Sequence, residues 1–582
     1  HQATLRGDFD NAIDPSGKTI TLKGVVKAAS ALITSGPHQD AINLANVDAN
    51  TPTTIAAGGN STITIGLINA ASGGLLNQIA GQLTIDGGAG GSSTLVVNDA
   101  ADANNVTGTL ATAGSNAVLS GLGMGGSIQY RNLQTAEIAL GSGSNLFNVM
   151  ATLAGTTTTV TLGAGASTVR VGGPNGTATD TVRGIQGLLN LVGNDTSATL
   201  NLVDTGETQA TSATIGTSRI TGLGMGADPA TAGIQYNRFT ALNVSLGSGA
   251  DTVAVTGIAT PTLLNTGTGG DSVRVGQATG SIGLTLITSQ LTVQGSGSAN
   301  DQLTIQSNIS SALTLDETSP TIGLVTGVGS TTDPGQIAFS GMATLVVAQS
   351  DTDASSLTIN NTVTRTIANS GGGGHQIAVN RAANEITLNL GADDDAVVRD
   401  AGAAVSVIGG ATNTLTLDLS ATTQALNAKI LDGPTPGSSA LLRGFLLSGG
   451  DVNVSNVGKV TVDEGTGNDT IEINTTDASS ILTLNAASGD NSYTVKAIGA
   501  VTNIVGGDGT DTVTLVIPGL PTANQFANLN ATVANLFVDN SAYTAPVAWT
   551  NSDGSIFAAP ASGGSAVLVV NASSAALTKI VG

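Results

Sequence analysis

The segment "TNIVGGDGTDTVTL" (502–515) contains the pattern from which the fold can be inferred. A short stretch of alternating apolar and polar residues leads into a Gly-rich turn, and a second alternating stretch follows Asp511. Alternation with a period of two is typical of β-strands that have one buried face. Gly and Asp tolerate the backbone conformations of tight turns. The segment therefore predicts two short strands joined by a turn.

The same strand–turn–strand pattern recurs along the chain, for example in "LNVSLGSGADTVAV" (242–255) and "VTVDEGTGNDTIEI" (460–473). The steps from Asp469 to Asn491 and from Asn491 to Asp511 are 22 and 20 residues long. A step of about 20 residues suits one coil of a β-solenoid, in which successive turns stack in a column. The spacing thus favours an all-β, parallel β-helix-like repeat body.

A longer repeat is superimposed on these coils. "GLGMGGSIQY" (121–130) returns as "GLGMGADPATAGIQY" (222–236), and a fainter copy is "GLVTGVGSTTDPGQIAF" (323–339). A unit of roughly 105 residues, or about five coils, recurs about four times. About 105 residues is also the size of an immunoglobulin-like domain, so tandem β-sandwiches are the alternative architecture.

The composition favours the solenoid over the sandwiches. Aromatic residues make up only 2% of the 582 residues, whereas Gly occurs 79 times. Few aromatic side chains indicate a thin core filled by small aliphatic residues. Sandwich domains usually bury a large aromatic residue in each core.

Charge and residue usage exclude several functional classes. The chain carries 18 basic and 40 acidic residues, a net charge of −22, so nucleic-acid binding is not expected. It has no Cys, and its histidines, His1, His38 and His375, are too scattered for a triad or metal cluster. No catalytic motif is present, so we expect no enzyme. The sequence contains no uninterrupted apolar run of about 18 residues, so it predicts no membrane-spanning helix.

The sequence divides into three regions. Residues 1–76 form an N-terminal strand or assembly region, residues 77–515 form the repeat body, and residues 516–582 form a C-terminal cap or assembly module. The last region is distinguished by its aromatic residues and prolines. Stacked repeats expose a sheet edge at each end, and such edges need caps or partners.

The Gly/Asp turns are the candidate metal sites. Ca²⁺ prefers six to eight oxygen ligands from carboxylates and turn carbonyls, and aligned turns could supply them. Asp and Asn also hydrogen-bond their own turn backbone, so turn chemistry without metal is the alternative. The candidate calcium ligands are Asp251, Asp271, Asp395, Asp469, Asp508 and Asp511.

The segment "GGDGTDTVT" (506–514) resembles the nonapeptide of RTX proteins, which bind calcium in a parallel β-roll. The chain departs from that pattern because its motifs are 18–22 residues apart and never tandem nonamers. Over about residues 77–515 it more closely resembles bacterial β-strand-repeat surface proteins. That resemblance implies an exported protein of the cell surface, and it implies no activity.

Together these features predict a secreted structural protein that self-assembles into a filament or surface layer. The start at His1 is consistent with removal of a leader peptide. "TITLKGVVKA" (19–28) and "SAVLVVNA" (565–572) are the candidate strands for contacts with other copies. The alternative function is an adhesin whose repeats form a stalk and whose partner is a cell-surface glycan or matrix.

Overall fold

The structure is a computed structural model of the chain. The described residues are 1–7, 17–36, 38–69, 73–88, 90, 92–174, 177, 179–228, 230–277, 283–307, 311–319, 322–330, 332–349, 354–433, 439–552, 555–571 and 577–581. The chain forms two compact units. Unit 1 comprises 1–276, 284–302 and 329–342, and unit 2 comprises 277–283, 303–328 and 343–582.

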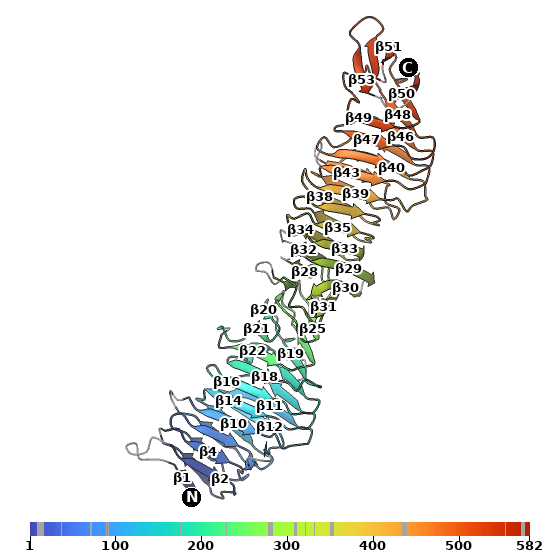
Figure 1. The fold of residues 1–582 in the computed structure, drawn as a ribbon. Helices are drawn as coiled ribbons and strands as arrows, with labels where there is room; N and C mark the ends of the chain where they lie inside the picture. Colours follow the sequence, from blue (N-terminus) through green and yellow to red (C-terminus); the bar gives the residue numbers. More distant parts are fainter. Residues whose placement is uncertain are drawn as a thin grey trace. The chain divides into compact units, whose positions relative to one another are not determined.

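Each unit is a β-solenoid, which confirms the predicted fold class (Figure 1). Most coils contribute one strand to sheet A and the next strand to sheet B, and equivalent strands of successive coils pair in parallel. Short alternating segments suit this arrangement because every second side chain enters the core. Isolated parallel bridges such as Val47–Ile79 join further corners of neighbouring coils.

The strands of unit 1 follow the expected alternation. In sheet A they are β1 (Gln2–Arg6), β3 (Ser30–Thr34), β5 (Thr53–Ala56), β9 (Leu83–Asp86), β13 (Ser127–Arg131), β12 (Asn116–Gly121), β11 (Thr107–Ala113), β15 (Leu146–Val149), β17 (Thr168–Val171), β19 (Thr199–Val203), β23 (Ala241–Ser245), β25 (Thr262–Asn265), β27 (Gln290–Gln294) and β31 (Pro334–Ser340). In sheet B they are β2 (Thr19–Leu22), β4 (Ala41–Leu44), β6 (Thr62–Ile65), β10 (Thr94–Asn98), β14 (Thr135–Ala139), β16 (Thr157–Thr161), β18 (Leu188–Val192), β22 (Gly233–Asn237), β21 (Arg219–Gly222), β20 (Ser212–Ile215), β24 (Thr252–Val255) and β26 (Ser272–Gly276). A small hairpin, β7 (Leu67–Asn69) and β8 (Gly73–Gly74), and one 3-10 turn, η1 (Val182–Gly184), lie between coils.

Unit 2 repeats the same plan. In sheet A the strands are β30 (Ile322–Gly329), β29 (Ala312–Ser319), β33 (Ser356–Asn361), β35 (Gln376–Val379), β37 (Asp395–Val398), β39 (Thr414–Asp418), β43 (Lys459–Asp463), β45 (Ile481–Asn485), β47 (Thr502–Val505) and β49 (Leu529–Thr532). In sheet B they are β28 (Gln302–Ser307), β32 (Thr344–Gln349), β34 (Arg365–Ser370), β36 (Ile386–Asn389), β38 (Val405–Ile408), β42 (Val452–Ser455), β41 (Ser439–Arg443), β40 (Asn427–Asp432), β44 (Thr470–Ile473), β46 (Ser492–Val495), β48 (Thr512–Val516), β50 (Asn535–Asp539) and β54 (Leu577–Val581). A separate antiparallel sheet contains β51 (Val547–Ser552), β52 (Ser555–Pro560) and β53 (Val567–Asn571).

The register stacks apolar side chains in continuous rows. Ile128 of β13 pairs with Leu83 of β9, and Tyr130 pairs with Ile85. All four side chains are at most 1% exposed. Burial of such rows is the main favourable contribution to the stability of a repeat body. Tandem sandwiches would require antiparallel Greek-key sheets, so the parallel pairing excludes that alternative within the described residues.

The 105-residue repeat corresponds to a reversal of chain direction. In unit 1, β11 and β12 pair antiparallel, as do β12 and β13, while β13 pairs in parallel with β9 and β11 with β15. The strands β20, β21 and β22 form the same arrangement in sheet B. Nine strands, β11 to β19, precede the second reversal. The repeat is therefore about four and a half coils long, rather than the expected five.

The repeated "GLGMG" sequence forms the turn after each reversed strand of unit 1. Gly121, Leu122 and Gly123 all have positive φ angles, of 80°, 53° and 71°. A positive φ is unusual for Leu, but Leu122 is fully buried and its N–H donates to the carbonyl of Thr107 at 2.9 Å. Leu223, in the second copy, has the same conformation and is also buried. Burial of the Leu side chain offsets the strain of its backbone.

Among the described residues, no helix is long and apolar enough to span a membrane. The three regions inferred from sequence composition remain a prediction about domain organisation. Parallel coils already begin with β1 and β2, inside residues 1–76.

Candidate functional site

In unit 1, the predicted turn aspartates form a buried ladder directly before the strands of sheet B. The carboxylate Oδ1 of Asp251 accepts the backbone N–H of Thr211 at 2.8 Å. The backbone N–H of Asp251 then donates to Oδ1 of Asp271 at 2.9 Å, and that of Asp271 to Oδ1 of Asp301 at 3.0 Å. The three carboxyl groups are at most 2% exposed. Each side chain thus connects its own coil to the preceding one.

Unit 2 contains an equivalent ladder with a neutral member. Oδ1 of Asp469 accepts the N–H of Leu426 at 2.7 Å, and the N–H of Asp469 donates to Oδ1 of Asn491 at 2.8 Å. The N–H of Asn491 donates to Oδ1 of Asp511 at 3.1 Å, and the Asn491 amide group donates to the same oxygen at 2.8 Å. All three side chains are at most 2% exposed.

The same position is polar in other coils, with different side chains. In sheet A of unit 2, Nδ1 of His375 accepts the N–H of Ser355 at 3.1 Å, and the N–H of His375 donates to Asp394 at 2.7 Å. In unit 1, the N–H of Asn145 donates to the hydroxyl of Ser167 at 3.1 Å. The position therefore requires a hydrogen-bond acceptor rather than a charge.

Two of the six predicted metal ligands lie outside the ladders. Asp395 is exposed at the start of β37 and accepts the hydroxyl of Thr414. Asp508 is exposed in the turn before β48, where its backbone bridges to Ser488. The structure brings Asp251 and Asp271 together in one ladder, and Asp469 and Asp511 in another, but it leaves Asp395 and Asp508 apart from them.

The ladders account for one carboxylate oxygen, Oδ1, of each buried aspartate, whereas Oδ2 of Asp271 and of Asp469 has no hydrogen-bond donor among the described residues. Their Oδ1 atoms are occupied by backbone N–H groups, which compete with a cation for the same lone pairs. Within the described part of the chain, no three His, Cys, Asp or Glu side chains group as metal ligands. Calcium binding remains a prediction, and Asp395 and Asp508 are the candidates most accessible to solvent.

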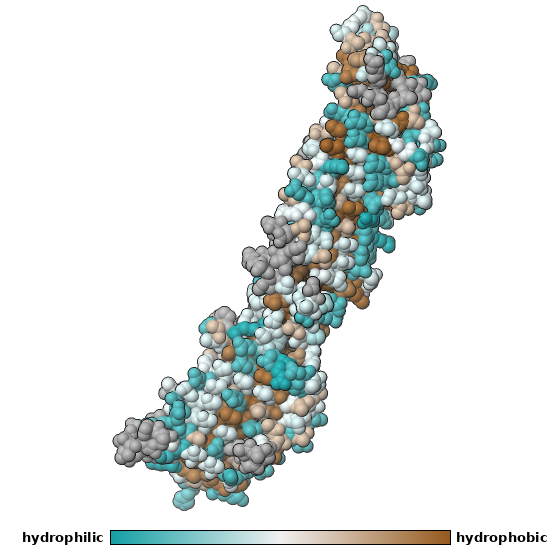
Figure 2. All heavy atoms as spheres, in the orientation of Figure 1, coloured by the Kyte–Doolittle hydropathy of each residue, from teal (hydrophilic) through white to brown (hydrophobic). Residues whose placement is uncertain are grey.

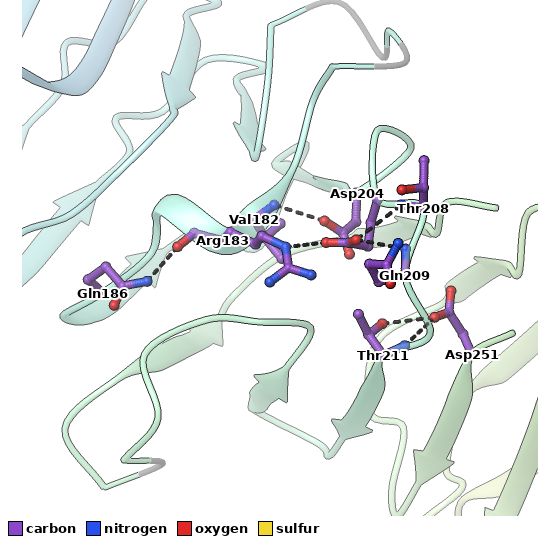
Figure 3. A network of polar contacts seen from close by, with 9 residues as sticks. Val182, Arg183, Gln186, Asp204, Thr208, Gln209, Thr211 and Asp251 are labelled. Carbon is purple, nitrogen blue, oxygen red and sulfur yellow. Dashed lines mark hydrogen bonds and ion pairs between the residues drawn. The ribbon is translucent and has the colours of Figure 1, made fainter. Parts of the chain in front are cut away.

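A second polar network lies beside the ladder of unit 1 (Figure 3). Glu207 accepts the N–H groups of Thr208 and Gln209 at 3.0 and 2.9 Å and forms an ion pair with Arg183. Hydrogen bonding from Arg183 lowers the pKa of Glu207. Glu207 is therefore ionised, and its charge faces the neighbouring Asp204.

Asp204 is 1% exposed, and one of its oxygens accepts the N–H of Val182 at 2.9 Å. Its other oxygen, Oδ2, has no donor among the described residues. Burial raises the pKa of Asp204 to about 7; the Val182 N–H opposes this shift, and the charges of Glu207 and Asp251 add to it. The group thus titrates near neutral pH.

The preceding repeat contains the same feature 105 residues earlier. Asp99 is also 1% exposed, its Oδ1 accepts the N–H of Leu76 at 3.0 Å, and its Oδ2 lacks a donor in the described chain. Burial raises the pKa of Asp99 to about 7, and the charge of Asp102 contributes. A buried carboxyl group with one unmatched oxygen is therefore a recurring feature of unit 1.

Several members of these networks are not among the six predicted metal ligands. Asp301, Asp394 and His375 occupy ladder positions, and Asp204 and Glu464 are buried carboxyl groups. For the first three, the available signal was a polar residue immediately before an alternating stretch. No sequence signal distinguishes Asp204 or Glu464 from exposed acids.

A surface hollow of unit 1 has a volume of about 690 Å³. Its lining consists of small or neutral side chains, including Ser92, Ser115, Gln134, Leu153 and Thr156. It contains no titratable group that could act as an acid, base or nucleophile. The hollow therefore gives no basis for assigning a reaction.

No protein-family model matches the chain, and no curated protein matches it. The fold and the ladders are consequently the basis for the functional proposal that follows.

Proposed function

We propose that the chain is a secreted bacterial structural protein of the cell surface, and that it self-assembles into a filament or surface layer. The proposal assigns it no catalytic reaction. The observation that carries it is the surface of unit 1 formed by β1 and β2, where each strand has one neighbour among the described residues and apolar side chains are half-buried.

The first coil is paired on one side only among the described residues. β1 pairs in parallel with β3, and β2 pairs in parallel with β4. Their other edges present backbone N–H and C=O groups that can extend a sheet. The stretch 19–28, expected as a free donor strand, contains β2, and β53 of the C-terminal stretch pairs with β52. In the proposal, the other edges of β1 and β2 accept a strand from a second copy.

The apolar side chains of the first coil are incompletely covered. Leu5 and Leu22 are half-buried, whereas their register partners in the next coil, Ile33 and Leu44, are 1% and 2% exposed. Val25 nearby is 51% exposed. Figure 2 shows apolar side chains at the end of unit 1 where Figure 1 places β1 and β2. Covering this surface would provide a hydrophobic driving force for association.

The charge of this end supports a second copy of the chain as its partner. Lys23 and Lys27 are exposed beside β2, whereas the whole chain has a net charge of −22. Exposed lysines and an acidic chain attract each other and orient an encounter between copies.

Electron microscopy of the purified chain tests the proposed function directly. We expect filaments or sheets, and uniformly single particles at high protein concentration would reject self-assembly.

The variant Leu22→Lys places a charge in the half-buried apolar surface, and we expect it to abolish the polymers while circular dichroism shows a folded β-protein. Thr21→Lys is the matched control, since Thr21 is exposed on the same strand. Polymers of Leu22→Lys would exclude this end as the contact.

The C-terminal module favours the adhesin alternative. β51 is an exposed edge strand that contains Trp549, the single Trp of the chain, only half-buried. Partly exposed Trp side chains are enriched in recognition surfaces. In this alternative the partner is a cell-surface glycan or matrix, and single particles that bind such material would replace assembly as the function.

Calcium is a separate part of the proposal. At the exposed carboxylates Asp395 and Asp508 it would neutralise acidic turns and rigidify the body. Thermal melting with and without a chelator tests it: calcium binding predicts a lower melting temperature after chelation, and an unchanged one rejects a structural ion.

A further inference from the structure

A cationic side chain neutralises an acidic turn at the second chain reversal of unit 1. Arg183 forms an ion pair with Glu207, close to Asp204 (Figure 3). The two acids belong to one turn, in which the N–H of Glu207 donates to the carbonyl of Asp204 at 2.9 Å. The Arg183 side chain also lies against Gly224 of the second "GLGMG" sequence, where a Cβ atom added to the glycine would be 3.2 Å from Nη1 of Arg183. The guanidinium group therefore lies beside both the acidic turn and Gly224.

The first chain reversal has the same backbone arrangement. The N–H of Asp102 donates to the carbonyl of Asp99 at 2.9 Å, and the N–H of Leu76 donates to Oδ1 of Asp99 at 3.0 Å. The second reversal contains the same two hydrogen bonds at the equivalent positions. Asn77 follows Leu76 directly, so it corresponds in position to Arg183.

The side chains at the first reversal are shorter, and they supply oxygen atoms instead of a cation. Asn77 stands in the place of Arg183, and Asp102 stands in the place of Glu207. A Cβ atom added to Gly123, the equivalent glycine of the first "GLGMG" sequence, would be 3.8 Å from Cβ of Asn77 and 3.9 Å from Oδ2 of Asp102. The two side chains therefore approach the same point beside this glycine.

The acidic turn of the first reversal is not neutralised by the segments that form it. These segments, 74–80, 99–105 and 121–126, contain no Lys or Arg. Asp99 and Asp102 are 1% and 5% exposed, and Oδ2 of Asp99 has no hydrogen-bond donor among the described residues. Burial of carboxylates without a partner is costly. The turn therefore favours a bound cation.

We propose that a calcium ion binds at the first reversal, in the place that the Arg183 guanidinium group takes at the second. Oδ2 of Asp102 and the side-chain oxygen of Asn77 are its ligands, and the buried carboxyl group of Asp99 adds a second negative charge. Ca²⁺ accepts carboxylate, amide and water oxygens in flexible geometries, whereas Mg²⁺ demands a near-ideal octahedron. Because the protein supplies few ligands, the expected dissociation constant is on the order of 10⁻⁴ to 10⁻³ M.

This site is separate from the calcium sites predicted from the Gly/Asp turns. None of its residues is among the six candidate ligands, and none belongs to the ladders described above. It combines two carboxyl groups with an amide, so it differs from the groups of three His, Cys, Asp or Glu side chains that the described residues lack. Binding at this site does not depend on whether the chain assembles.

Equilibrium dialysis of the full chain with radioactive calcium counts the bound ions at protein concentrations near the expected dissociation constant. Asn77→Arg places a guanidinium group where the second reversal has one, so we expect this variant to bind one calcium ion fewer than the wild type. Gln78→Arg is the matched control, since Gln78 is exposed next to Asn77 and the change adds the same charge. Equal numbers for Asn77→Arg and the wild type, or the same loss in Gln78→Arg, would overturn the proposal.

A second variant removes the ligand without adding a cation. Asp102→Asn retains an oxygen that can accept the N–H of Asn104, as Oδ1 of Asp102 does at 2.9 Å. Circular dichroism checks that the variant keeps its β-fold. We expect it to lose the same single ion, and an unchanged number would show that the ion lies elsewhere.

The reverse exchange predicts a gain. Arg183→Asn combined with Glu207→Asp converts the second reversal into a copy of the first. We expect the double variant, folded by circular dichroism, to bind one calcium ion more than the wild type. A folded double variant that binds no additional ion would contradict the proposed ligands.

Discussion

The ladders of unit 1 and unit 2 have the same hydrogen-bond pattern but different charges. Unit 1 stacks the carboxyl groups of Asp251, Asp271 and Asp301, whereas unit 2 places neutral Asn491 between Asp469 and Asp511. The Asn amide donates to Asp511, which Asp271 cannot do for Asp301 as a carboxylate. The comparison shows that each coil of a ladder requires a hydrogen-bond acceptor, whereas a negative charge is not required. A buried charge at this position lowers the stability of the fold.

The largest effect is expected from converting the second ladder into the first. Asn491→Asp places three acids in a row beside buried Glu464. We expect it to lower the free energy of unfolding by about 3 kcal/mol at pH 8, because it removes a donor and adds a buried like charge. At pH 4 the loss should be much smaller. Denaturant unfolding at both pH values measures it.

Asn468→Asp is the matched control, because Asn468 is exposed in the stacked turn one coil earlier and its side-chain oxygen accepts the N–H of Asp490. A similar loss in both variants would mean that the buried charge is not the cause.

A smaller effect is expected from Asp204, next to the first ladder. Its raised pKa means that its stabilisation is complete below about pH 4 and is lost as the pH rises through 7. We expect Asp204→Asn to remove roughly 2 kcal/mol of the stability that the wild type loses between pH 4 and pH 8. Calorimetry across this range checks the prediction, and parallel pH profiles for the two proteins would contradict it.

Converting the first ladder into the second should stabilise it. Asp271→Asn retains the acceptor for the N–H of Asp251 and supplies an amide donor to Asp301. We expect a gain of about 1 kcal/mol at pH 8 that becomes smaller as the pH falls, because burial raises the pKa of Asp271 and protonation removes its charge. A loss of stability at pH 8 would show that the carboxylate charge has a role of its own, such as binding a cation.

The smallest effect is expected on the outer face of the sheets. Asn243 donates to the side chain of Asn201 at 2.8 Å, and both are partly exposed. We expect Asn243→Ala to cost about 0.5 kcal/mol at any pH, because water replaces the lost partner. Denaturant unfolding measures this cost. A cost that changes with pH would contradict the prediction, because neither Asn243 nor Asn201 titrates.

Part of this arrangement could be predicted from the sequence. The alternating segments predict the strands, and the regular step along the column, such as that from Asn491 to Asp511, predicts the stacking of the turns. The pairing direction follows from that stacking. The environment of Glu464 could not be predicted, because it includes Tyr493 of a later coil. The hydroxyl of Tyr493, on β46, donates to Oε2 of Glu464 at 2.8 Å. The chain reversals were visible only as a repeated "GLGMG" sequence, since β11 and β12 have the same alternation as any other strand.

The odd number of strands between reversals has an evolutionary consequence. In unit 1 the first reversal lies in sheet A and the second in sheet B, because nine strands separate their starting points. Gain or loss of one repeat by recombination would move every later strand to the opposite sheet. If repeats are gained or lost in this way, the strands that follow must be able to form part of either sheet A or sheet B. Peptides inserted at the tips of successive hairpins, at 114–115 and 216–218, would correspondingly be displayed from different sheets of the same unit.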